Sequence, residues 1–376
     1  MLHRAVRGLA RGAGTPYRET MRRHLWIVLS LWIVPLYAEE LPVRGLHLMA
    51  PDPDQVPLLI DFITRDLPAE GVNTLILEVG YGFQWRSHPE LVQGTGLSRE
   101  QAAAIARAGR EAGIRVIPML NCLGHQSWAA NTFPLLTRYP QFDETPGLYP
   151  GNEGIYCRSY CPLHPGVHGV VNALIDELLE AFEANAFHVG MDEVFLLGEE
   201  ACPRCRGRNR AELFAGEVSR LHAHLKARGA EMWMWGDRFL DGVVTGIGKW
   251  EASENGTAPA VDLVPKDIVI ADWHYEFSPP TAGYFAVKGF PVVMSPWRKP
   301  EVGLQHLDQI RRIRESANPA IADRALGVLH TTWCNPGQFI RAYRGESEGV
   351  SDSARESAAC FRRLFEEIRR FVSAAQ

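Results

Sequence analysis

The feature that most constrains the fold is an alternation of short apolar runs with amphipathic stretches, which begins near residue 42 and continues almost to the C-terminus. Eight of the apolar runs have the length of single strands: 43–49, 73–79, 114–120, 187–191, 230–235, 267–273, 290–296 and 326–332. Helical patterns lie between them, at 55–66, 99–112, 167–184, 208–228 and 303–316. Strands that alternate with helices favour a parallel sheet covered by helices. Eight such units in about 300 residues predict a (β/α)8 TIM barrel.

A doubly wound open sheet is the alternative architecture, but no Gly-x-Gly-x-x-Gly follows the first strand. The final stretch, 352–374, predicts a C-terminal helix, because Phe361, Leu364, Ile368 and Phe371 recur at helical spacing. The sequence contains no low-complexity linker and no internal repeat. We therefore expect one barrel domain over 39–376, which includes this helix.

Residues 1–38 have the layout of a secretory signal. Two arginines precede the apolar run 25–37, which ends in Leu-Tyr-Ala before Glu39. An uncleaved anchor is the alternative, because Leu36 is larger than the residue preferred near a cleavage site, and Met21 is an alternative start. We expect an exported protein, periplasmic or extracellular. No run of transmembrane length follows this segment, so no stable membrane span is expected after cleavage.

The charge balance argues against nucleic acid as a partner. Residues 1–38 carry six arginines and one glutamate, so the net charge of −5 for the whole chain leaves about −10 for the rest. A domain that binds phosphate backbones needs an excess of Lys and Arg. The sequence does not indicate the oligomeric state.

The seven cysteines include two close pairs. Cys157 and Cys161 flank Arg-Ser-Tyr, and Cys202 and Cys205 form Cys-Pro-Arg-Cys. In an exported protein, disulfides are favoured over a structural metal site or free thiols, although all three uses fit the spacing. We predict that the loops around the fourth strand bring the two pairs together and that Cys202 and Cys205 are oxidised. No cofactor or metal ion is expected.

Acids and aromatic rings gather after the predicted strands, where a TIM barrel places its chemistry. Asp192 and Glu193 stand side by side directly after the run 187–191. An adjacent acidic pair often marks only a helix N-terminus, and a single tryptophan is usually part of the core. Here, however, the same predicted rim carries Trp85, His125, Trp128, Trp235, Asp237, Asp272, Trp273, Tyr275, Trp297 and Trp333. Aromatic faces stack on sugar rings and carboxylates bind hydroxyls or cleave glycosidic bonds, so this rim favours a carbohydrate site.

The segment "FHVGMDE" (187–193) resembles the His-x-Gly-x-Asp-Glu signature of family 20 glycoside hydrolases, the β-N-acetylhexosaminidases. The resemblance extends to "RGLHLM" in the first strand, "GHQSW" after the third, and the later segments "WHYE" and "TTW". It covers about 43–340, the whole expected barrel. The segment "LGEEACPRC" is similar to a shorter, barrel-only subgroup.

The resemblance implies a substrate-assisted reaction on a terminal β-linked N-acetylhexosamine, GlcNAc or GalNAc, with retention of configuration. Glu193 would be the general acid and then the base, and Asp192 would orient the 2-acetamido group that attacks the anomeric carbon. The remaining implied roles are a hydrogen bond from Tyr275 to the acetamido carbonyl, pocket walls from Trp235, Trp273 and Trp333, hydroxyl binding by Arg44, and support of the acids by His125. Two of these residues have a structural alternative. Arg44, at the start of a strand, would form a surface ion pair, and His125 would be a buried structural histidine.

The sequence also departs from the family pattern. Met119 and Asn121 stand where many members carry acids before the glycine-histidine turn, and Asn335 stands where an acid often follows the last tryptophan. Sugar identity therefore stays open. Two other functions compete: a two-carboxylate glycosidase that pairs Glu193 with Glu276 or Asp237, and a sugar-binding barrel that has lost catalysis. A zinc-dependent enzyme is disfavoured, because His and Asp do not cluster at ligand spacing.

Overall fold

The computed structural model describes residues 41–316 and 318–374. The predicted signal segment, 1–38, lies outside the described residues, so its cleavage and the expected export remain predictions. Within the described part, none of the helices combines the length and apolar composition that crossing a bilayer requires.

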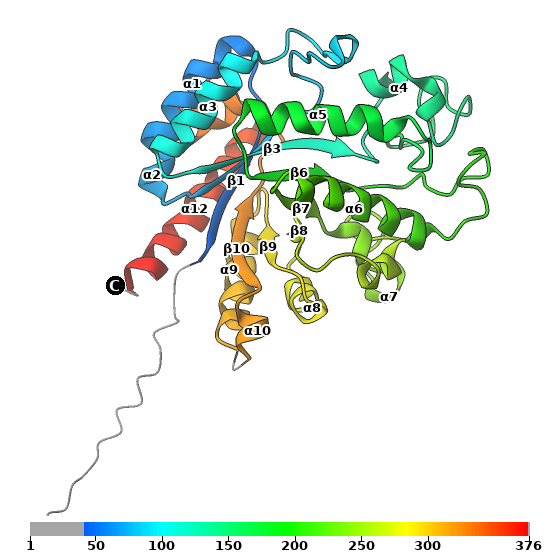
Figure 1. Cartoon of the computed structure of the whole chain (residues 1–376). Coiled ribbons are helices and arrows are strands. Elements are labelled where there is room, and N and C mark those ends of the chain that lie inside the picture. The colour runs from blue at the N-terminus through cyan, green and yellow to red at the C-terminus, as the bar shows by residue number, and fades with distance from the viewer. Residues whose placement is uncertain (1–40, 317, 375–376) are drawn as a thin grey trace, which may run out of the picture. The chain divides into compact units, whose positions relative to one another are not determined.

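Eight parallel strands close into a barrel (Figure 1). Around the barrel they follow the order β1-β10-β9-β8-β7-β6-β3-β2, and β1 closes the ring by pairing with β10, Leu46 opposite His330. The strands are β1 Val43–Met49, β2 Thr74–Glu78, β3 Arg115–Cys122, β6 Ala186–Gly190, β7 Glu231–Trp235, β8 Val269–Trp273, β9 Val292–Ser295 and β10 Ala325–His330. The TIM-barrel prediction is confirmed, and each predicted strand overlaps an observed one.

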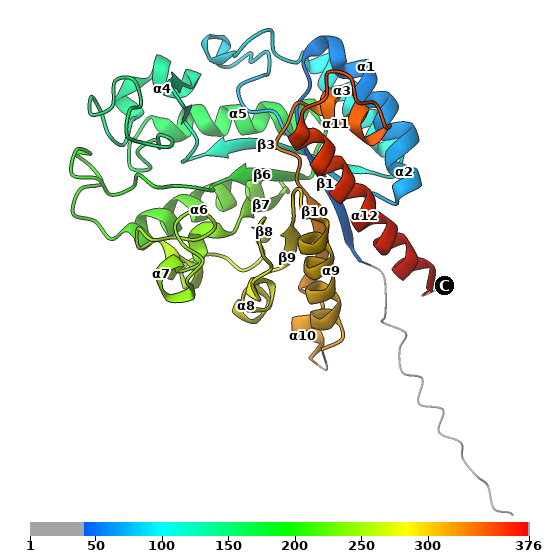
Figure 2. The ribbon, with the colours of Figure 1, turned by 180° about the vertical axis from the view of Figure 1, so that it is seen from behind.

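Helices lie outside the strands, as both views of the ribbon show (Figure 2). The longer ones are α3 Arg99–Glu111, α5 Val167–Ala181, α6 Arg210–Ala227, α8 Thr281–Lys288, α9 Pro300–Arg314, α11 Pro336–Tyr343 and α12 Asp352–Ala374. The shorter ones are α1 Val56–Asp61, α2 Leu67–Glu70, α4 Pro134–Arg138, α7 Gly242–Thr245 and α10 Pro319–Ala322, and a small hairpin joins β4 Ser127–Trp128 to β5 Asn131–Thr132. The helix predicted at 55–66 continues as a π-helical turn and α2 as far as Gly71, whose left-handed φ of 79° ends it.

Helix α12 confirms the predicted C-terminal helix. Its residues Phe361, Leu364 and Ile368 are almost completely buried, and Phe371 packs against the same core. The helix contacts α2, α9 and α11, so it covers the outside of the barrel near its closing strands.

The barrel interior is packed with side chains. Ile76, Ile117, Trp233, Val293 and Leu329 fill it, and a larger apolar layer separates the strands from the helices. Because side chains fill the interior of a TIM barrel, its active site forms over the loops at the carboxyl ends of the strands. The arrowheads of β3 and β6 point to the end where the long connections that carry α4 and α7 lie (Figure 1).

Candidate active site

The acidic pair sits on a backbone that few residues can adopt. Gly190, the last residue of β6, has a left-handed φ of 69°, and a Cβ there would lie 2.2 Å from Oδ1 and 2.9 Å from Cα of Asn121 on β3. Met191 and Glu193 also have positive φ, 75° and 47°. Such backbone is costly for residues with a side chain and is common where function holds it in place. The glycine in "FHVGMDE" is therefore required by geometry.

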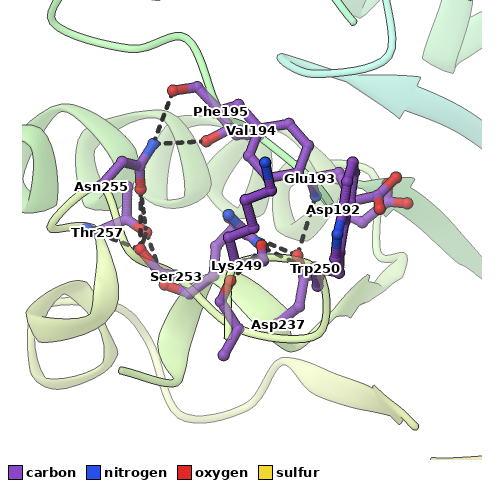
Figure 3. A network of polar contacts seen from close by, with 12 residues as sticks. Asp192, Glu193, Val194, Phe195, Asp237, Lys249, Trp250, Ser253, Asn255 and Thr257 are labelled. Carbon is purple, nitrogen blue, oxygen red and sulfur yellow. Dashed lines mark hydrogen bonds and ion pairs between the residues drawn. The ribbon is translucent and has the colours of Figure 1, made fainter. Parts of the chain in front are cut away.

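The loop after β7 fixes the backbone of the acidic pair. The N–H of Glu193 donates to Oδ2 of Asp237 at 2.9 Å, and the same oxygen accepts Nε of Arg238 at 2.6 Å. The Arg238 guanidinium in turn donates to the carbonyls of Lys249 and Trp250, at 2.9 and 3.2 Å. Figure 3 shows this network of polar contacts around Asp237.

Asn255 fixes the residues that follow the acids. Its Nδ2 donates to the carbonyls of Val194 and Phe195, at 2.8 and 3.0 Å (Figure 3). Ser253 completes this part of the network by donating to Oδ1 of Asn255 at 2.8 Å. The acids are thus placed by a strand end and by a second loop, which gives the rigid support that a catalytic group needs.

His125 bridges the two acids from the turn after β3. Its Nε2 lies 3.1 Å from Oδ2 of Asp192 and 3.1 Å from Oε2 of Glu193. The turn packs closely on the acidic loop, because a Cβ on Gly124 would lie 2.8 Å from the carbonyl oxygen of Asp192. His125 itself has a positive φ of 51°. The predicted position of His125 beside the acids is therefore observed.

The surroundings drive the pKa values of the two acids apart. Burial alone would raise the pKa of Asp192, but the charge and the contact of His125 outweigh it, so this pKa lies below its usual value. Burial raises the pKa of Glu193; the contact with His125 opposes that rise, while the charge of Asp192 adds to it. Burial also works against a protonated His125, yet Asp192 and Glu193 hold the pKa of His125 well above its usual value. Opposite pKa shifts in two neighbouring carboxyl groups favour the proton on Glu193 over Asp192, which is the direction that acid catalysis by Glu193 needs.

His125, Asp192 and Glu193 bring three groups of metal-ligand type within 4.8 Å of one another. A protonated imidazole has no lone pair for a metal ion. Without an ion, Asp192 and Glu193 hold the pKa of His125 high, so the three groups form an ion-paired acid–base site.

Four aromatic side chains form a box beside the acids. The Trp333 Nε1–H donates to the Tyr275 hydroxyl at 2.6 Å, the rings of Trp235 and Trp333 are 5.7 Å apart, and those of Trp273 and Tyr275 are 5.0 Å apart. Burial holds the pKa of Tyr275 well above its usual value. The hydroxyl therefore stays protonated and can donate a hydrogen bond to a ligand. The four predicted pocket residues therefore lie together, and His188 links them to the acidic strand by packing 4.6 Å from Trp235.

A buried ionic chain places Tyr275. Glu251 accepts the backbone N–H of Tyr275 at 3.1 Å with one oxygen and contacts Nδ1 of His274 at 2.9 Å with the other. Nε2 of His274 lies 3.1 Å from Asp272. Burial would lower the pKa of His274, but Asp272 and Glu251 raise it to about 9, so the imidazole carries its extra proton at neutral pH.

The rim of the site contains aromatic residues that the sequence did not single out. Tyr156 packs 5.1 Å from Trp128 and 5.0 Å from Trp250, and burial together with the charge of Glu193 raises the pKa of Tyr156. Trp128 and Trp250 are 51% and 46% exposed. Tyr156 and Trp250 follow no predicted strand, so the strand-end argument could not find them.

The prediction for Arg44 is wrong. Arg44 stands near the start of β1, at the opposite end of the barrel from the acids, and its guanidinium donates to the carbonyls of Gly71 and Leu41 at 2.7 and 2.9 Å. Only the carboxyl ends of the strands face the site. Asn335 does not face a substrate either, because its side chain caps the first turn of α11.

The polar groups that do face the substrate side near β1–β3 are Glu78 and Asn121. Glu78 ends β2 and accepts Nδ2 of Asn121 at 2.8 Å, while its other oxygen lies 3.2 Å from Nε2 of His47. Glu78, Asn121 and His125 line one cleft of about 390 Å³. The sequence did not single out Glu78, although it ends β2, because the family pattern drew attention to the third and eighth strands.

The disulfide prediction for the cysteines is also wrong. All seven cysteines lie in the described part of the chain and are free thiols. Cys161 does approach Cys202 and Cys205, but Cys157 points elsewhere and donates to the carbonyl of Glu193 at 3.5 Å. The four residues are therefore not two pairs.

Neither carboxylate proposed as a second catalytic group is suitably placed. Glu276 is about half exposed and paired with Lys299 at 2.6 Å. Asp237 is buried and already engaged by Arg238 and by the backbone of Glu193.

Comparison with known proteins agrees with this geometry. The family model "Glycosyl hydrolase family 20, catalytic domain" matches residues 76–312, well over half of the chain. The chain belongs to glycosyl hydrolase family 20. The matched residues make up most of the barrel, so the barrel corresponds to the catalytic domain of that family.

Individual family 20 relatives are distant. A Beta-hexosaminidase of Porphyromonas gingivalis is 24% identical over 173 residues, which cover 43% of this chain and 22% of that protein. Among solved structures, the chitobiase of Flavobacterium johnsoniae matches with a TM-score of 0.59 and 20% identity, over 89% of this chain and 52% of that one. The family 20 exo β-N-acetylglucosaminidase of Vibrio harveyi, in complex with N-acetylglucosamine, matches with a TM-score of 0.58 and 15% identity, over 89% and 59%. The matched part thus spans well under two thirds of each of these relatives, and at this identity the structures show the fold alone.

Proposed function

We propose that the protein is an exo-acting hydrolase that removes a terminal β-linked N-acetylhexosamine, with retention, by a substrate-assisted mechanism. The observation that carries the proposal is the pair Asp192–Glu193, whose pKa values are driven in opposite directions around a shared histidine. The named relatives, which include an exo β-N-acetylglucosaminidase, support this substrate class.

In the first step Glu193 donates its proton to the glycosidic oxygen while the acetamido oxygen of the substrate attacks the anomeric carbon. The bond to the leaving sugar breaks, and an oxazolinium ion forms. In the second step the Glu193 carboxylate takes a proton from water, the water oxygen adds to the anomeric carbon, and the acetamido group is released. Two displacements on one carbon give net retention.

Asp192 supports both steps through the acetamido N–H. Its Oδ2 contacts His125, whereas its Oδ1 is buried and has no hydrogen-bond partner among the described residues. A buried carboxylate oxygen without a partner is costly, and the substrate N–H would provide that partner. The Tyr275 hydroxyl, which accepts from Trp333 and retains its own proton, is placed to hold the acetamido oxygen.

Glu78 and Asn121 are the best candidates to bind sugar hydroxyls in place of Arg44. They line the cleft next to His125, and both carry hydrogen-bonding atoms at its surface. The aromatic rim formed by Trp128, Tyr156 and Trp250 would contact the sugar on the leaving side.

The mechanism can be tested with nitrophenyl β-glycosides that differ only at the 2-position. We expect hydrolysis of the N-acetylglucosaminide or N-acetylgalactosaminide, little hydrolysis of the glucoside, and strong inhibition by GlcNAc-thiazoline, because mimics of high-energy states bind far more tightly than substrates. Glu193→Gln should lower turnover about 10²–10⁴-fold on a poor leaving group and less on an activated phenol. A covalent sugar trapped on an enzyme carboxylate, or equal activity on the plain glucoside, would support the two-carboxylate scheme instead.

A further inference from the structure

Four buried groups of metal-ligand type meet outside the catalytic site. Glu144 and Cys161 lie in the connection between β3 and α5, and Cys202 and Cys205 lie in the connection between β6 and α6. Their ligand atoms all lie within 4.8 Å of one another, and all four residues are buried. The Sγ atom of Cys161 is 3.4 Å from that of Cys202 and 3.5 Å from that of Cys205.

These distances fit a metal site better than a disulfide. A disulfide joins two sulfur atoms at about 2.05 Å, and it leaves the third sulfur of a trio unpaired. Ligands bound about 2.3 Å from a tetrahedral zinc ion stand roughly 3.8 Å apart, by the geometry of the tetrahedron. The observed sulfur separations are close to the second value.

Glu144 supplies the fourth corner. Its Oε1 accepts the backbone N–H groups of Gly198 and Glu199, at 2.8 and 3.2 Å, which fixes the direction of the carboxylate. Its Oε2 is buried and has no hydrogen-bond partner among the described residues. Hydrogen bonds that orient a ligand from behind, with a free lone pair in front, are typical of metal carboxylates.

The backbone holds the sulfur ligands in place. The Cys202 N–H donates to Glu199 and its carbonyl accepts the N–H of Arg206, at 2.9 and 3.1 Å, so the Cys-Pro-Arg-Cys turn is closed on itself. The Cys161 N–H donates to Phe142 at 2.6 Å. Two cysteines with two residues between them, together with ligands from a distant part of the chain, are the usual layout of a structural zinc site.

We propose that Glu144, Cys161, Cys202 and Cys205 bind one structural divalent metal ion, zinc. All four corners of the tetrahedron are protein ligands, so the ion has no open position for a substrate and its role is to hold structure. It would join the loop after β3 to the loop after β6, and these two loops carry His125 and the acids Asp192 and Glu193. The site does not depend on which sugar the enzyme takes.

Metal analysis of the purified full-length protein tests the proposal directly. Inductively coupled plasma mass spectrometry should find about one zinc per chain after exhaustive dialysis, and a mercurial should release it as the thiols are blocked. After replacement of zinc by cobalt, the protein should show the intense visible absorption of tetrahedral thiolate cobalt. Protein with less than about a tenth of an equivalent of zinc, which also fails to take up zinc or cobalt after reduction, would overturn the proposal. So would a disulfide mapped among Cys161, Cys202 and Cys205 in freshly purified protein.

Variants then locate the ion. Cys205→Ser should abolish the cobalt absorption and lower the melting temperature, whereas Cys334→Ser, at a half-buried thiol outside the cluster, should leave both unchanged. Glu144→Gln should retain the three thiolates but weaken zinc binding by more than the roughly 10–100-fold that loss of a ligand's hydrogen-bond partner costs, because Glu144 is itself a ligand. If Cys205→Ser fails to fold, the proposal is still tested by the zinc content of the wild type and by the zinc affinity of Glu144→Gln, which should be lower. Undiminished zinc in a folded Cys205→Ser protein would refute the assignment.

Discussion

Removing the positive charge of His125 should move the pH profile of hydrolysis to higher pH. His125→Gln retains a hydrogen-bond donor near the acids but not the charge. In the wild type the charge of His125 lowers the pKa of Asp192 and also opposes the rise in the pKa of Glu193. Both pKa values should therefore rise in the variant.

The distances set the size of the shift. Two unit charges 3.1 Å apart attract by about 5 kcal/mol at an effective dielectric constant of about 20. If solvent and neighbouring groups screen three quarters of this, about 1.4 kcal/mol remains, which corresponds to roughly one pKa unit. The acidic limb of the profile reports ionisation of Asp192, and the alkaline limb reports loss of the Glu193 proton. Each limb should move up by about one pH unit.

The measurement is kcat/KM against pH with a nitrophenyl N-acetylhexosaminide. His224→Gln is the matched control, because His224 pairs with Asp176 at 2.8 Å on helices α6 and α5, away from the site. Its profile should coincide with that of the wild type. If His125→Gln lowers the rate with both limbs unmoved, or moves them to lower pH, His125 does not set the charge of the acids and the electrostatic account is refuted.

Three further predictions concern the support of the site. Trp333→Phe should keep an aromatic wall but remove the donor to Tyr275, so kcat on the N-acetyl substrate should fall about 5–10-fold, the worth of one hydrogen bond, with a smaller change in KM; an unchanged kcat contradicts this. The ion pairs of His274 should contribute about 3 kcal/mol to the free energy of unfolding, because its pKa rises from 6.5 to about 9 on folding. That stability is fully present below about pH 6.5 and is lost as pH rises through about 9, so denaturant titrations should find the deficit of His274→Gln large at pH 6 and nearly absent at pH 10; a deficit independent of pH rejects the ion pairs. Gly190→Ala should lower the free energy of unfolding by well over 1 kcal/mol, because Gly190 has a positive φ and lies against Asn121. Gly169→Ala, at an open position in α5, should raise the free energy of unfolding by about 0.5–1 kcal/mol. Equal melting temperatures for the two variants would contradict this.

The strand–helix alternation was enough to predict the barrel, because the strands of a parallel sheet are buried on both faces. Such strands are continuous apolar runs that can be recognised from the local sequence. The same reasoning placed Asp192, Glu193, Trp235, Tyr275 and Trp333 at one end, since a residue that closes a parallel strand must lie there. The role of Arg44 was inferred from the family resemblance and not from strand ends, and it is wrong because Arg44 lies at the beginning of its strand.

Other parts of the site depend on long-range contacts that no local pattern contains. Tyr156 reaches Glu193 from the middle of a long connection, and Glu251 reaches Tyr275 from a loop more than twenty residues earlier. Cys161 lies beside Cys202 and Cys205 because of how two loops pack on each other, which the sequence does not reveal. The spacing of the cysteines also does not indicate that Cys157 lies outside this group.

The left-handed backbone at His125, Glu193 and Trp333 places three residues of the proposed active site in a conformation that costs folding stability. The three residues have φ between 44° and 51°, a backbone that glycine adopts freely and that asparagine adopts more readily than glutamate or tryptophan does. Random substitution followed by selection for heat resistance alone should therefore enrich inactive proteins with Gly or Asn at these three positions. Thermostable variants that still hydrolyse sugar would have to gain their stability elsewhere, for example on the outer faces of the helices.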